Sequence, residues 1–123
     1  MRLVTSIQHK ACADGSYMKE YVIDEPLTAE FFQYLKNFGR VEEMAGLGDG
    51  FFKFDKPDFF SIKGLAGDDT VEVRFKRETM DITVDFLLML FSMYKRGDTD
   101  IAYLKTKEAF REKRVQEHLF QNG

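Results

Sequence analysis

Residues 82–94 read ITVDFLLMLFSMY, and the central FLLMLF contains no polar side chain. This composition is typical of an α-helix that is apolar around most of its circumference. Asp85 and Ser92 lie seven residues apart on one helical stripe, but Leu88 and Met89 interrupt that stripe. We therefore expect the helix to be covered on several sides, either between layers of its own domain or against a second copy. It is too short to cross a bilayer, which needs about 20 apolar residues.

The totals are those of a small globular protein. The chain has 123 residues, 44% of them hydrophobic and 15% aromatic, which is enough for one domain with its own core. A net charge of -3 disfavours nucleic-acid binding, because nucleic-acid domains carry a basic excess. Cys12 is the only cysteine, and residues 1–10 hold no apolar signal core. We expect a single cytoplasmic domain over residues 1–123.

The first three quarters of the chain predict strands around one helix. Residues 2–12 and 17–24 are β-rich runs that flank Asp14-Gly15-Ser16, so they predict a hairpin. A helix is expected next, with Thr28 as its N-cap and Gly39 as its terminating residue. Four further strands are predicted, at residues 40–47, 51–54, 58–65 and 70–77.

The pattern after the apolar stretch is less regular. The apolar side chains there do not form one unbroken helical stripe, because Glu108 and Arg111 occupy positions that the pattern needs; they are Ile101, Leu104, Phe110, Val115 and Leu119. We expect a final helix from Lys107 to about Leu119, with Thr106 as its cap. Residues 100–105 are expected to form either a separate turn or helix, or a short strand.

The predicted order of elements is ββ-α-ββββ-α-α, which belongs to the α+β class. Helices in such a chain gather on one face of an antiparallel sheet. We therefore predict a curved antiparallel sheet of about six strands with the helices packed on one face.

No motif predicts a cofactor, a metal site or an identifiable catalytic residue. The glycines of residues 46–50 run into a strand rather than a helix, which favours a hairpin turn over a phosphate cradle. His9 and Cys12 face opposite sides of a regular strand, so they cannot share a zinc ion without a bulge. Asp81 and Asp85 could share a helical face as an acid/base pair, but aspartate is common in a first helical turn.

The C-terminal segment contains the only basic cluster of the chain. Its cations alternate with glutamates at spacings of three and four residues, which favours a solvated helix face with intrahelical ion pairs. The residues are Lys105, Lys107, Glu108, Arg111, Glu112, Lys113, Arg114 and Glu117.

Three functional hypotheses follow, in order of preference. The first is a non-catalytic interaction module that self-associates as a homodimer, because apolar side chains in the second strand, in residues 51–60 and in the helix at 82–94 point two ways. The second is a small-molecule-binding protein or enzyme, whose aromatic pocket between the sheet and helix 82–95 has Asp85, Arg74 and His9 as polar groups. The third is a weak nucleic-acid binder that uses the face of Arg74 and Lys76. Neither a cofactor nor a membrane partner is expected, and the sequence leaves open whether the protein is an enzyme.

Overall fold

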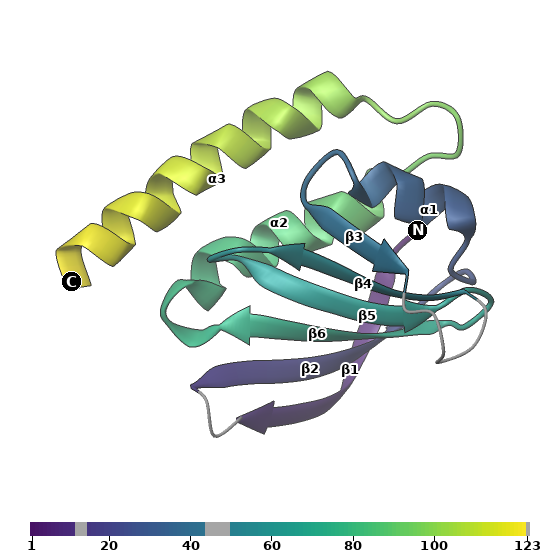
Figure 1. Cartoon of the computed structure of the whole chain (residues 1–123), viewed down its shortest axis with the longest axis horizontal. Helices are drawn as coiled ribbons and strands as arrows, with labels where there is room; N and C mark the ends of the chain where they lie inside the picture. Colours follow the sequence, from purple (N-terminus) through teal and green to yellow (C-terminus); the bar gives the residue numbers. More distant parts are fainter. Residues whose placement is uncertain (12–14, 44–49, 123) are drawn as a thin grey trace.

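The computed structural model describes residues 1–11, 15–43 and 50–122, which form one antiparallel sheet and three α-helices (Figure 1). The elements in chain order are β1 (Leu3–Ala11), β2 (Ser16–Ile23), α1 (Ala29–Leu35), β3 (Arg40–Glu43), β4 (Phe51–Lys56), β5 (Phe60–Leu65), β6 (Thr70–Lys76), the 3-10 turn η1 (Arg77–Thr79), α2 (Met80–Ser92) and α3 (Ile101–Asn122). The predicted α+β class and order of elements are confirmed.

The strand order is β1-β2-β6-β5-β4-β3. Consecutive strands pair except at β2, whose second neighbour is β6, with Tyr21 opposite Val71. In the first hairpin, Gly15 has φ of +88°, a conformation that glycine adopts without steric penalty. Asp14, Cys12 and the predicted glycine turn at residues 46–49 lie outside the described residues.

One face of the sheet supplies the core. In β6, Val71, Val73 and Phe75 are buried, while Arg74 and Lys76 are exposed, so the predicted alternation is confirmed. The neighbouring strands continue this face with the buried side chains of Tyr21, Ile23, Phe52, Phe54, Phe60 and Ile62. The helices pack on this side of the sheet, with α2 against the strands and α3 beyond it (Figure 1).

The apolar stretch forms the centre of the fold, as expected. Phe86, Leu87, Leu90 and Phe91 are fully buried. The phenyl ring of Phe86 lies 5.8 Å from that of Phe59 and 5.9 Å from that of Phe38, measured between centroids. The solvent-facing stripe of α2 consists of Asp81, Asp85, Leu88 and Ser92. A single copy of the chain therefore buries the apolar side of α2.

Helix α1 starts as predicted and is tied to α2. The Thr28 hydroxyl accepts a hydrogen bond from the Phe31 amide at 3.2 Å, which is an N-cap. The Tyr34 hydroxyl donates to the Leu90 carbonyl of α2 at 2.7 Å. Burial, with a smaller contribution from Tyr94, raises the pKa of Tyr34 above its ordinary value of 10.0. Regular helix ends at Leu35, before the predicted stop at Gly39.

The final helix is longer than predicted and begins earlier. Residues 101–105 are helical, and the Asp100 carboxylate accepts from the Tyr103 amide at 3.0 Å, so Asp100 takes the capping position. Thr106 is not a cap: it lies inside α3 and its hydroxyl donates to the Ala102 carbonyl at 3.1 Å. No helix in the described ranges is long and apolar enough to span a membrane.

Candidate functional site

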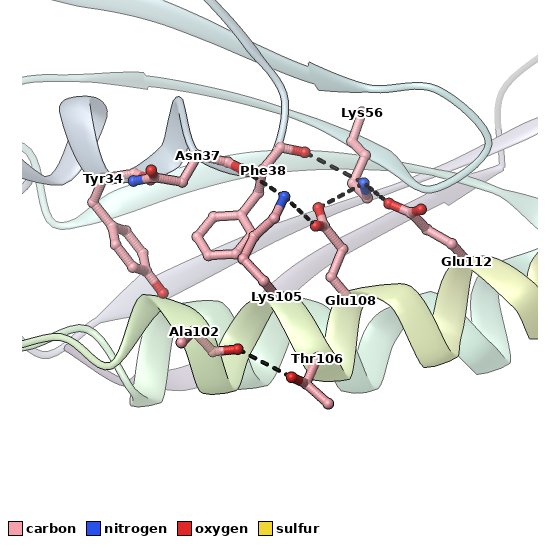
Figure 2. A network of polar contacts seen from close by, with 9 residues as sticks. All are labelled: Tyr34, Asn37, Phe38, Lys56, Ala102, Lys105, Thr106, Glu108 and Glu112. Atoms are coloured by element: carbon pink, nitrogen blue, oxygen red, sulfur yellow. Dashed lines mark hydrogen bonds and ion pairs between the residues drawn. The ribbon is translucent and has the colours of Figure 1, made fainter.

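A buried lysine fastens α3 to the sheet. Lys56 is the last residue of β4, where the strand alternation places it on the core face after Phe52 and Phe54. Its Nζ donates to Glu108 Oε2 at 2.8 Å and to Glu112 Oε1 at 2.9 Å, both on α3. Figure 2 shows the lysine reaching from β4 to these two carboxylates.

All hydrogen-bond donors of the Lys56 ammonium have acceptors within the protein. Its third contact is the Phe38 carbonyl at 3.3 Å, and its ammonium lies 4.7 Å from the centre of the Phe59 ring. An ammonium has three N–H donors, and all three have acceptors here. The Lys56 and Glu108 side chains are 10% and 5% exposed. No donor is left for a substrate, so we interpret this cluster as a clamp between β4 and α3 rather than as a catalytic centre.

The predicted intrahelical pairing of the basic cluster is only partly present. Lys105 forms an ion pair with Glu108 and also donates to the Asn37 carbonyl at 3.0 Å. Glu108 and Glu112 also form ion pairs with Lys56, which belongs to the sheet rather than to α3. Among the described residues, Lys113 and Glu117 have no ion-pair partner within 4.0 Å.

Helix α3 has two differently composed sides. The side toward the rest of the protein, which we call the docking stripe, is buried or half-buried and consists of Ile101, Leu104, Glu108, Arg111, Val115 and Leu119. The opposite side, which we call the outer stripe, is exposed and consists of Tyr103, Thr106, Phe110, Lys113, Glu117 and Phe120. At 100° per residue the two stripes are centred roughly 160–200° apart around the helix.

The outer stripe carries the largest exposed aromatic side chains. Phe110 is 61% exposed and Phe120 is 83% exposed, whereas Tyr103 is partly covered by Lys107, whose Nζ lies 5.3 Å from the ring centre. Within the described part of the chain, Phe110 and Phe120 make no contact with another ring or with a cation. Both rings thus leave apolar surface in contact with water on the side of α3 that faces away from the sheet.

The residues predicted to line a ligand pocket lie on different parts of the molecule. Asp85 is on the solvent-facing stripe of α2, and Arg74 is exposed on β6, with Nε 3.4 Å from Glu72 Oε1. His9 belongs to β1, where it pairs with Lys19 of β2 in the strand register; its side chain is outside the described part. The space between the sheet and α2 is occupied by the packed rings described above.

Two open cavities flank the turn between β4 and β5. One of about 350 Å³ is lined by Ser16, Arg74 and Lys76, and another of about 370 Å³ by Arg40 and Glu112; both share residues 55–59 of the turn. Lys76 is paired with Asp58 at 3.1 Å, and Arg74 with Glu72, so the face proposed for nucleic acid holds paired rather than free cations.

Metal ligation finds no support in the described ranges. No group of three or more His, Cys, Asp or Glu side chains there could hold a metal ion. Scans of the chain against protein families, curated proteins and solved structures find no significant match. The candidate site therefore rests on this chain's own geometry, which singles out the outer stripe of α3.

The spacing of residues along α3 identifies both of its sides, but Phe110 is assigned to the wrong side in the sequence analysis. There, Phe110 is included among the inward apolar residues and Glu108 and Arg111 are treated as interruptions of the stripe, and the structure reverses both assignments. Without Phe110, the other four fall on one side together with Glu108 and Arg111. The two interrupting polar residues are thus part of the docking stripe, and Phe110 is the residue that does not belong to it.

Proposed function

We propose that this protein is a non-catalytic interaction module that self-associates through the outer stripe of α3. The observation that supports this function is the exposure of Phe110 and Phe120 on the side of α3 opposite to the docking stripe. Apolar rings of this size bind partners because covering them removes apolar surface from water. The Lys56 clamp holds α3 in place, so the stripe is presented on a fixed element.

The surface that supports self-association differs from the surface that the sequence suggested. The aromatic strands and α2 were expected to need a second copy, but most of their large side chains are already covered within one chain, and Phe52, Phe54, Phe86 and Phe91 are fully buried. The most exposed aromatic rings, those of Phe110 and Phe120, are instead on the final helix. Self-association therefore remains our proposal, with a different interface.

The experiment is a concentration series of the purified protein in sedimentation velocity or light scattering. We expect a monomer–dimer equilibrium at micromolar concentrations, weakened by Phe110→Ala and by Phe120→Ala. Leu88→Ala is the matched control, because Leu88 is 44% exposed but lies on α2. A wild-type protein that stays monomeric over the whole series would refute the proposal.

A further inference from the structure

The geometry points to one arrangement of the dimer. We infer that a second copy of this chain packs on α3 in antiparallel orientation, with the two-fold axis level with Val115. Phe110 then faces Phe120 of the partner subunit, and Lys113 faces Glu117 of the partner subunit. This inference rests on the proposed function, since it specifies the partner and the register of the same stripe.

The spacing of the stripe defines the register. Phe110, Lys113, Glu117 and Phe120 follow one another at intervals of three, four and three residues, which is the spacing of a seam between two helices. The four positions are symmetric about residue 115, because Phe110 and Phe120 lie five residues from it and Lys113 and Glu117 two. A two-fold axis at that level therefore pairs each of these four positions with another of the four, as an isologous interface requires.

The charges select this arrangement over others. A parallel pair would place Lys113 against Lys113 of the partner subunit and Glu117 against Glu117 of the partner subunit, which are repulsive contacts. An antiparallel pair shifted by one heptad would place Lys113 on Phe110 of the partner subunit and leave Glu117 without a cation. Only the axis at Val115 gives two aromatic contacts and two ion pairs, and neither Lys113 nor Glu117 has an ion pair within its own chain among the described residues. Arg114 of each copy lies at the rim, where solvent and salt screen their repulsion.

The fold leaves room for the second copy. The docking stripe, with Leu104, Glu108 and Val115 buried, turns toward the sheet and α2, so the outer stripe faces away from the body of the molecule. In Figure 1, α3 lies along one side of the molecule and its C-terminal turns extend beyond the sheet. The body of the partner would then lie on the far side of the paired helices, without overlap.

The area predicts a weak dimer. A phenylalanine side chain offers about 150–250 Å² of surface, so the exposed fractions of Phe110 and Phe120 amount to about 300 Å² of aromatic surface per copy. Stable interfaces bury about 800 Å² per partner, and transient ones less. Lys113, Glu117 and Thr106 add contact area, but the pair stays below the standard size. We therefore expect dissociation in the micromolar range or weaker.

Exchanging the charges of Lys113 and Glu117 tests the antiparallel register of the two helices. Lys113→Glu should weaken the dimer by about tenfold or more, because it sets two pairs of glutamates against each other, and Glu117→Lys should do the same with two pairs of lysines. The double variant Lys113→Glu/Glu117→Lys restores opposite charges at both contacts and should return the dissociation constant to within a few fold of the wild type. Lys36→Glu is the control, since it makes the same charge change at an exposed position beyond the stripe.

The outcomes separate this inference from the proposed function. A wild-type dimer that Lys113→Glu leaves unchanged, or that the double variant fails to restore, overturns the arrangement while self-association stands. A wild-type protein that is monomeric at every concentration overturns both. If that monomer also sediments with vesicles of anionic phospholipid, and Phe110→Ala abolishes this binding, the outer stripe is a membrane-surface site and both proposals are wrong.

Discussion

Removing the positive charge of Lys56 should loosen the attachment of α3 to the sheet. In Lys56→Met the hydrocarbon stem is kept, so contact with the Phe59 ring is largely preserved, and the loss is the ammonium. Glu108 is then a buried carboxylate that has lost one of its two cations. Removing one partner of a buried ion pair destabilises a protein by about 3–5 kcal/mol.

The expected magnitude is smaller than that range, for two structural reasons. Lys105 still pairs with Glu108, although its side chain is half exposed, and Glu112 is 49% exposed and can be rehydrated. We therefore expect Lys56→Met to lower the free energy of unfolding by about 2–3 kcal/mol. Replacing both partners, as in Lys56→Met/Glu108→Leu, should recover most of the loss, to within about 1 kcal/mol of the wild type.

The assay is urea denaturation followed by circular dichroism, with amide exchange of α3 to detect local detachment. Glu112→Gln is the internal comparison, because Glu112 binds the same ammonium but its side chain is half exposed, whereas that of Glu108 is buried; its effect should be about 0.5–1 kcal/mol, less than that of Glu108→Gln. The reasoning fails if Lys56→Met lowers stability by less than about 1 kcal/mol. It also fails if Glu112→Gln and Glu108→Gln have equal effects.

Three further variants test other parts of the fold. Asp100→Ala should lower the free energy of unfolding by about 1 kcal/mol through loss of the cap on the Tyr103 amide, while Thr106→Ala should be nearly neutral; thermal melts with the reverse ranking would restore Thr106 as the helix start. Wild-type stability should fall as pH rises above about 10, because the unfolded chain releases the Tyr34 proton there and the folded chain, with its raised pKa, does not; Tyr34→Phe should give a shallower fall in denaturation measured from pH 8 to 11, and equal slopes would contradict this. Gly39→Ala should destabilise by about 1–3 kcal/mol, since the added Cβ would lie 2.6 Å from the Phe54 ring, whereas an unchanged melting temperature would mean that this contact relaxes freely.

Local patterns predicted much of the fold because each depends on residues close in sequence. The alternation of Val71, Val73 and Phe75 places one face of β6 inward whatever its neighbours are. Likewise the capping hydroxyl of Thr28 needs only the amide of Phe31, three residues on. The predicted strand at residues 51–54 is shorter than β4, which ends at Lys56. A lysine at that position is typical of a loop, and its place in the strand is explained only by its ion pair with Glu108 of α3.

The partners of α3 could not be predicted in the same way, because they are distant in sequence. Glu108 and Lys56 are separated by 52 residues, yet each is anomalous where it stands: the glutamate interrupts an apolar helical stripe, and the lysine follows Phe52 and Phe54 on the inward side of a strand. A buried charge is tolerated only with a partner of opposite sign, so two such anomalies of opposite charge in one small domain indicate that they meet. The same reasoning applies in reverse to Phe110 and Phe120. They are apolar residues on the outward side of a helix, where no ring or cation in the described part of their own chain pairs with them, which is why we propose that a second molecule covers them.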